Sequence, residues 1–387
     1  MLANQTITIS PQPTLWFGVD QSRRVAEAVR STGEHRALVI TDEGIRRSGI
    51  IDHLADALRN DGCETAIFDD VVANPTTDTL DAGARALREF GRAAVVAVGG
   101  GSSLDVAKGV AIAGVNSGSG RDFDYRNQHP VAPRPIVAIP TTAGTGSETN
   151  AFGVIDDPVT GEKFYVGHAA TLARVAILDP RLHVALPPRV TAATGLDALA
   201  HAIECLSSRS HNPYADALAL EAARLIIRSL PIAVESGDHL DARSNMAFAS
   251  HMAGVAFAAG TGLGLGHGIA HAVSAQCGAV HGEVLAVVLP EVMRFNLTVR
   301  QSAYARLAGA LGVGDSRRSD ESNAAAAIDA VAALSERVGV PRRLSGLGCS
   351  PDAFSAIATK ARRDEVTLNA PRPPTDDDIL MILEATR

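Results

Sequence analysis

AAVVAVGGGSSLDVAKG, residues 93–109, begins as an apolar strand, turns through glycines and continues as a helical pattern. Glycines at such a turn let backbone N–H groups approach a pyrophosphate, and the positive end of the helix dipole stabilises the anion. The turn consists of Gly99, Gly100, Gly101 and Ser102. It lacks the GxGxxG spacing, so on its own it could be an ordinary tight turn. Its position at the carboxyl end of a predicted parallel strand favours a phosphate-binding site.

The residues around this stretch alternate between strand and helix patterns. Apolar runs typical of strands occur at 36–41, 93–98, 135–139 and 175–179. Amphipathic helical patterns occur at 21–32, 43–60, 78–91 and 103–115. This alternation predicts an α/β domain, with a parallel sheet covered by helices on both faces.

The second half of the chain has a different pattern. After Pro187 and Pro188 the strand signals stop, and Ala/Leu-rich helical patterns follow at 212–230, 240–257, 301–311 and 323–338. We therefore expect an α/β dinucleotide-binding domain over residues 1–186 and an all-helical domain over residues 187–387.

Composition excludes several classes of protein. The chain has 387 residues, 46% of them apolar, and a formal net charge of -8, which disfavours nucleic-acid binding. Its four cysteines show no CxxC spacing, and the N-terminus shows no signal-peptide pattern, so we expect reduced thiols and a cytoplasmic protein. The apolar stretch 246–280 contains histidines and a glycine-rich break, which favours a buried helix pair over a membrane span.

A second turn, PTTAGTGSE at 140–148, follows the predicted strand 135–139. The hydroxyls of Thr141, Thr142 and Thr145 suit the ribose and phosphates of the ligand bound by the first turn, so we expect a dinucleotide. Asp42 ends another strand and could accept hydrogen bonds from an adenosine ribose while repelling a 2′-phosphate, which favours NAD over NADP. The alternative reading of Asp42 is a helix N-cap.

The helical half contains a second group of chemically active side chains. Asp197 and His201 are four residues apart and share one helix face, and His267, His271 and His281 follow in a stretch with almost no charge. Any one of these histidines could be a hydrogen-bonded core residue. One carboxylate and several imidazoles together indicate a divalent transition metal.

Spacing constrains which histidines can share an ion. His267 and His281 are 14 residues apart, or roughly 21 Å along one unbroken helix, so the helix must end between them. Gly278 is the expected breaker. Spacing alone leaves open whether His271 or His281 completes the site, and the i, i+4 pair of His267 and His271 would be the natural choice.

The chain resembles the iron-containing alcohol dehydrogenase family over nearly its whole length. The shared motifs are NPTTDT at 74–79, GGGSSLDVAK at 99–108, PTTAGTGSE at 140–148, AATGLDALAHAIE at 192–204, GLGLGHGIAH at 262–271, HGE at 281–283 and VTLNAPRPPTDDDI at 366–379. The resemblance implies an α/β nucleotide domain, a helical domain and an active site in the cleft between them. It also implies NAD as coenzyme and a homo-oligomer, a dimer or larger.

The resemblance also implies roles for individual residues. The metal ligands would be Asp197, His201, His267 and His281, with His271 beside the metal as a catalytic residue near the nicotinamide. Asn74, Asp105 and Lys163 join the coenzyme-binding residues, Lys163 close to the nicotinamide ribose. The metal would be Fe²⁺ or Zn²⁺, since imidazole and carboxylate suit both.

Two departures from the family pattern affect substrate choice. Family members often carry Thr-Asn-Pro-Arg near the C-terminus, with a Cys a few residues earlier, whereas this chain has Asn369-Ala370-Pro371-Arg372 after Val366. Phe152 stands where some relatives have a polar residue.

The expected activity is hydride transfer between NAD(H) and a small alcohol or aldehyde at a divalent metal. One alternative is a non-redox cyclase or lyase of the dehydroquinate synthase type, whose metal site uses a Glu and two His. Another alternative is a catalytically silent nucleotide-binding protein. The presence of Asp197 with all three histidine ligands favours the dehydrogenase.

Overall fold

The computed structural model describes residues 7–9, 11–160, 162–210 and 212–387. These residues divide into two units. The α/β unit contains Pro11–Thr142 and Gly146–His183, and the helical unit contains Val184–Arg387 together with residues 7–9 and Ala143–Thr145.

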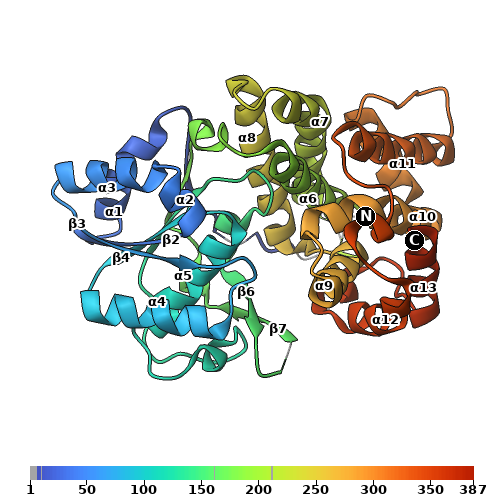
Figure 1. Ribbon diagram of the computed structural model, residues 1–387. Coiled ribbons are helices and arrows are strands. Elements are labelled where there is room, and N and C mark those ends of the chain that lie inside the picture. Colours follow the sequence, from blue (N-terminus) through green and yellow to red (C-terminus); the bar gives the residue numbers. More distant parts are fainter. Residues whose placement is uncertain (1–6, 10, 161, 211) are drawn as a thin grey trace. The chain divides into compact units, whose positions relative to one another are not determined.

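The apolar runs of the α/β unit pair into one parallel sheet (Figure 1). Its strands, in the order β1-β8-β5-β4-β2-β3, are β1 (Thr14–Phe17), β8 (Val175–Leu178), β5 (Ile136–Pro140), β4 (Ala94–Gly99), β2 (Arg36–Asp42) and β3 (Glu64–Val71). All neighbouring strands run parallel, as the sequence predicts. The carboxyl ends of β5, β4 and β2 therefore lie next to one another.

Helices cover both faces of this sheet because side chains along each strand alternate in direction. In β2, Leu38 and Ile40 pack with α4 (Thr77–Phe90) and α5 (Gly101–Ala113). Ala37 and Val39 point the other way, toward α1 (Val25–Ser31) and α3 (Ile50–Asn60) (Figure 1). Burying each large aliphatic side chain contributes about 1.5–3 kcal/mol, so this double layer holds the unit together.

Some elements differ from the sequence-based expectation. The predicted helix at 43–60 is two helices, α2 (Glu43–Arg47) and α3, because Gly49 at φ 81° interrupts it. Strand β3 was not expected: it lies at the sheet edge, half-exposed, and has no continuous apolar run. An antiparallel hairpin of β6 (Phe152–Asp157) and β7 (Glu162–Gly167) was not expected either.

The helical unit contains the long apolar helices expected after Pro188. They are α6 (Pro188–Ser207), α7 (Pro213–Glu235), α8 (Leu240–Ala256), α9 (Leu265–Cys277), α10 (His281–Ala310), α11 (Asp320–Arg337), α12 (Phe354–Arg363) and α13 (Asp376–Ala385). A π-helical turn, Phe257–Thr261, follows α8. The predicted helix at 301–311 is the last part of α10.

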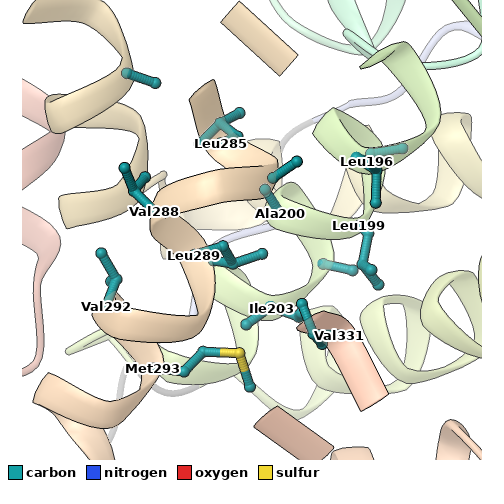
Figure 2. Packing of buried hydrophobic residues seen from close by; sticks show 14 of the residues in the cluster. Leu196, Leu199, Ala200, Ile203, Leu285, Val288, Leu289, Val292, Met293 and Val331 are labelled. Carbon is teal, nitrogen blue, oxygen red and sulfur yellow. The ribbon is translucent and has the colours of Figure 1, made fainter. Parts of the chain in front are cut away.

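The core of this unit lies around α6 and α10. Figure 2 shows Leu199 and Ile203 of α6 beside Leu289 of α10, with Val331 of α11 closing the cluster. These side chains are aliphatic, which agrees with an aromatic content of 4%. Small alanine side chains let helices approach closely, and α6 is buried along most of its length.

The helical conformation is interrupted between α9 and α10 at the expected residue. Gly278 ends α9 with φ 67°, a left-handed conformation that glycine adopts at little cost, and α10 begins at His281. Among the described residues no single helix is long and apolar enough to span a membrane. The pair Leu240–Thr261 and Leu265–Cys277 passes that test only when taken together, and it bends by 109°.

Candidate metal centre and nucleotide-binding turns

The four predicted metal ligands meet in the helical unit. Asp197 and His201 come from one face of α6, His267 from the first turn of α9, and His281 from the start of α10. The Oδ1 atom of Asp197 lies 3.4 Å from Nε2 of His201, 3.4 Å from Nε2 of His267 and 3.9 Å from Nε2 of His281. Donor atoms of Asp197, His267 and His281 all lie within 4.8 Å of one another.

This arrangement fits a divalent cation. The Oδ1 atom of Asp197 and Nε2 of His267 are buried, and neither has a hydrogen-bond partner among the described residues. Such atoms are costly to leave unpaired in a protein interior. Atoms that bind an ion at about 2 Å stand roughly 3–4 Å from one another, which is the spacing found here.

The ionisation of these side chains follows from their burial and from each other. Burial raises the pKa of Asp197, but the nearby His201 and His267 rings lower it to well below its usual range. Burial lowers the pKa of His201 to about 4, and burial also lowers that of His281. Both imidazoles are therefore neutral near pH 7, as metal binding requires.

His267 behaves differently because two carboxylates flank it. Burial acts to lower its pKa, but Glu204 and Asp197 outweigh that effect and raise the pKa to about 9. Its Nδ1 atom lies 2.6 Å from Oε2 of Glu204. A cation at this site would replace a proton on Nε2 of His267.

Sequence reasoning assigned no role to Glu204. Burial raises its pKa, but His267 outweighs that effect and lowers it below the usual value. Glu204 follows His201 by three residues and Asp197 by seven, which is same-face spacing on a helix. That spacing, in an otherwise apolar helix, is the signal that could have identified it.

His271 lies beside this group, and its nearest charged partner is a different carboxylate. Its Nδ1 atom lies 2.8 Å from Oδ2 of Asp364, and both side chains are half-buried. The His271 ring also contacts the rings of His267 and His281. Asp364 lies in the segment KARRDEV, where no pattern in the sequence marks it.

The two predicted phosphate-binding turns begin at the ends of adjacent strands in the α/β unit. Gly99 at the end of β4 pairs with Pro140 at the end of β5, and the backbone N–H of Thr141 donates to Gly99. Helix α5 begins at Gly101, and its N-cap, Gly100, supplies no side-chain acceptor. The first N–H groups of α5, including that of Ser102, are thus suited to an anionic ligand.

Asp42 ends β2 next to these turns. Its Oδ1 atom accepts a hydrogen bond from the backbone N–H of Ile45, so Asp42 is the N-cap of α2. Its Oδ2 atom accepts from the Ser103 hydroxyl at 3.3 Å. The cap reading is therefore correct, while each carboxylate oxygen retains lone-pair capacity for a ribose hydroxyl.

The Asp105 carboxylate makes several bonds within the protein. It accepts from the Ser147 hydroxyl at 2.6 Å and from the backbone N–H of Val154 at 3.0 Å. The buried Lys108 ammonium donates to Ser147 at 2.7 Å, to Asn150 at 3.0 Å and to the Phe152 carbonyl at 2.6 Å. Sequence reasoning missed Lys108 and Ser147, which together tie α5 to the second turn and to β6.

The other predicted coenzyme residues have varied surroundings. Asn74 is exposed beyond β3 with φ 53°. Thr141 is buried and Thr142 is half-buried at the end of β5. Thr145 belongs to the helical unit. Lys163 lies on β7, with Nζ 3.2 Å from Oδ1 of Asp156 on the facing strand.

Comparisons with known proteins bear on both halves of the chain. Residues 12–180 match the iron-containing alcohol dehydrogenase family, and residues 191–387 match the C-terminal region of the same family. The chain is 37% identical to 1,3-propanediol dehydrogenase of Klebsiella pneumoniae, covering 95% of both chains. It is 35% identical to NAD-dependent methanol dehydrogenase of Bacillus methanolicus, covering 96% of this chain and 97% of that protein.

A solved structure shares the fold. The crystal structure of a 1,3-propanediol oxidoreductase superposes with a TM-score of 0.96 at 35% identity, covering 99% of this chain and 100% of that one. The chain belongs to the iron-containing alcohol dehydrogenase family, and it is an oxidoreductase that interconverts alcohols and aldehydes.

Proposed function

We propose that Asp197, His201, His267 and His281 hold a divalent cation, Fe²⁺ or Zn²⁺, at which a small alcohol and its aldehyde are interconverted with NAD(H). The observation that carries this proposal is the convergence of three imidazole nitrogens on Oδ1 of Asp197, which is buried without a hydrogen-bond partner among the described residues. One carboxylate and three neutral imidazoles give a site of net charge about +1 with a divalent ion, which keeps it Lewis acidic.

The α/β unit would bind the coenzyme. The backbone N–H groups at Gly101 and Ser102, beside Gly99 and Gly100, suit the pyrophosphate, and Asp42 suits the adenosine ribose. Further contacts would come from Asn74, Thr141, Thr142, Thr145 and Lys163. The Asp105 carboxylate already accepts hydrogen bonds from Ser147 and Val154. We therefore propose that Asp105 stabilises the two turns and does not itself contact the coenzyme. A relative is named an NAD-dependent methanol dehydrogenase, which supports NAD as coenzyme.

The chemistry divides between the bound groups and the chain. When bound, the cation supplies stabilisation of negative charge on the substrate oxygen, and the nicotinamide supplies the acceptor or donor of hydride. His271 is our candidate for the proton-transferring residue. Asp364 holds Nδ1 of His271, which leaves Nε2 to exchange a proton with the substrate hydroxyl, directly or through water.

We propose a small alcohol or aldehyde as substrate, because two of the relatives are named for methanol and 1,3-propanediol. We also propose that the domains are residues 1–186, for the coenzyme, and 187–387, for the metal. The protein would work in the cytoplasm as a homo-oligomer, a dimer or larger. All four cysteines are free, which supports a reducing compartment.

The test is a metal analysis combined with a substrate panel. Protein prepared without oxygen should contain about one Fe²⁺ or Zn²⁺ per chain and should oxidise short primary alcohols with NAD⁺ or reduce their aldehydes with NADH. Asp197→Asn should lose metal and activity together. Wild-type protein that binds no divalent metal, or an Asp197→Asn variant that retains both properties, would refute the proposed site. Net NADH formation from a simple alcohol would exclude a cyclase or lyase of the dehydroquinate synthase type.

A further inference from the structure

Glu204 is a buried carboxylate for which the proposed reaction supplies no direct role. It lies on the same face of α6 as Asp197 and His201, and it is 3% exposed. A buried charge is retained only where hydrogen bonds or opposite charges compensate for its lost hydration. Its partners therefore indicate what it does.

Among the residues that the structure describes, the hydrogen-bond partners of the Glu204 carboxylate come from the start of α9. Its Oε2 atom accepts a hydrogen bond from the backbone N–H of Gly264 at 2.7 Å, and its Oε1 atom accepts from that of Gly266 at 2.6 Å. The third partner is Nδ1 of His267, 2.6 Å from Oε2. An ionised carboxylate can only accept hydrogen bonds, so Nδ1 of His267 carries a proton whether the ring is neutral or charged.

This tautomer has a direct consequence for the metal centre. With hydrogen on Nδ1, the lone pair of a neutral His267 is on Nε2, and Nε2 is the atom that lies 3.4 Å from Oδ1 of Asp197. The carboxylate also fixes the plane of the ring, because one imidazole atom is tied to α6. The ring then cannot rotate without breaking a buried hydrogen bond.

The glycines of the GLGLGHG motif make this contact sterically feasible. A Cβ atom on Gly266 would lie 2.8 Å from Oε1 of Glu204, closer than real side chains allow, and one on Gly264 would lie 3.2 Å away. The N-cap of α9 is Gly264, which offers no side-chain acceptor. The capping carboxylate therefore comes from another helix, and it also interacts favourably with the positive end of the α9 dipole.

We propose that Glu204 is a positioning residue for the metal centre, which holds His267 in the tautomer and orientation that present Nε2 to the cation. Gly264 and Gly266 are glycines so that this carboxylate can reach α9. The inference rests on the proposed metal site and extends it to a residue that does not contact the ion. Loss of such a hydrogen bond to a metal-binding histidine typically weakens metal affinity by about 10–100-fold.

The decisive variant is Glu204→Gln. The glutamine amide can donate a hydrogen bond to Nδ1, which favours the imidazole tautomer with hydrogen on Nε2 and blocks that nitrogen. We expect the affinity of the metal-free protein for Zn²⁺ or Co²⁺, measured by competition with a chelator, to fall by about 10–100-fold. The visible absorption spectrum of the Co²⁺-loaded protein should also change, because it reports the geometry of the ligands directly.

Gly266→Ala is a second, independent variant. It keeps the charge of Glu204 and every metal ligand, but its Cβ atom would push the carboxylate away from α9. We expect Gly266→Ala to weaken metal binding in the same direction. This variant keeps the proposal testable if Glu204→Gln does not fold.

The matched control is Asp216→Asn. Asp216 is another buried carboxylate of the helical unit, on α7, and it pairs with Arg306 at 2.6 Å. Thermal unfolding in the presence of a chelator measures the structural effect of each variant apart from metal binding. Asp216→Asn should lose stability and keep the wild-type metal affinity, whereas Glu204→Gln should lose metal affinity.

The variant Asp197→Asn distinguishes failure of the proposed metal site from failure of the proposed role of Glu204. If wild-type protein binds the metal and Asp197→Asn does not, the site itself is correct. Unchanged metal affinity and an unchanged Co²⁺ spectrum in both Glu204→Gln and Gly266→Ala would then overturn the role of Glu204 alone. If wild-type protein binds no metal, or if Asp197→Asn binds it as well as wild type does, the proposed site fails first and the inference fails with it.

Discussion

The imidazole rings of His271 and His281 are stacked, with centroids 5.2 Å apart and planes inclined by 21°. Despite this contact the two side chains face different carboxylates. Nε2 of His281 lies 3.9 Å from Oδ1 of Asp197, whereas Nδ1 of His271 lies 2.8 Å from Oδ2 of Asp364. We infer that His281 binds the metal and that His271 transfers a proton to or from the substrate.

The first prediction separates these two histidines. His281→Ala should lose metal and activity together, because it removes one of the four donors. His271→Ala should keep most of its metal and lose rate, as expected when only a proton-transferring group is removed. Metal analysis of the two purified variants decides between them. A metal-free His271→Ala beside a metal-replete His281→Ala would restore the i, i+4 pair of His267 and His271.

The second prediction concerns coenzyme choice and Asp42. Because Asp42 also caps α2, Asp42→Asn is the right substitution: asparagine caps helices as well as aspartate does but carries no charge. Relief of repulsion toward a 2′-phosphate should improve the use of NADP relative to NAD by about 1–3 kcal/mol, or roughly 5- to 150-fold. The ratio of kcat/KM for the two coenzymes measures this effect. An unchanged ratio would mean that Asp42 is only a cap.

A third prediction distinguishes two neighbouring glycines. Gly99 has φ 149°, and a Cβ atom there would lie 2.4 Å from Oγ of Ser103. Gly99→Ala should therefore lower both the free energy of unfolding, by about 1–3 kcal/mol, and the affinity for NADH. A Cβ atom on Gly100 meets nothing closer than Cγ2 of Thr142 at 3.5 Å.

Gly100→Ala is the matched comparison. It should fold normally but bind NADH less tightly, because its methyl group covers backbone that the pyrophosphate approaches. Both variants should keep their metal, since Asp197 and the histidines are untouched. NADH titration, thermal unfolding and metal analysis are the measurements. If Gly100→Ala binds NADH normally, the pyrophosphate does not approach this residue.

The fourth prediction concerns the buried Lys108 ammonium. Burial lowers its pKa, and Asp105 opposes that effect. Lys108→Met removes its hydrogen bonds to Ser147, Asn150 and Phe152, and we expect a loss of about 3 kcal/mol in the free energy of unfolding. Lys360→Met is the control on an exposed lysine, with an expected change within about 0.5 kcal/mol. Equal stability of the two variants would show that the network around Lys108 contributes little.

Local features of the fold could be predicted from sequence because they depend on residues close together in the chain. The alternation of strands and helices follows from hydrophobic periodicity, and the turn after β4 follows from its glycines. The end of α9 is a third example: Gly278 is the residue that adopts a left-handed conformation at little cost. Strand β3 was missed because it lies at the edge of the sheet and pairs with β2 alone. Its partly exposed positions carry polar residues, which interrupt the apolar run that marks the other strands.

The sequence by itself determined the types of donor in the site, a carboxylate and several imidazoles, and the two glycine-containing turns. Only the tertiary structure decided which atoms meet. Glu204 and Gly264 are 60 residues apart, and Asp105 and Ser147 are 42 residues apart, yet both pairs are hydrogen-bonded. Helical spacing relates only residues on the same helix, whereas these contacts depend on how α6 packs against α9 and how α5 packs against the loop before β6. That packing is set by apolar burial over whole helices, which no short motif encodes.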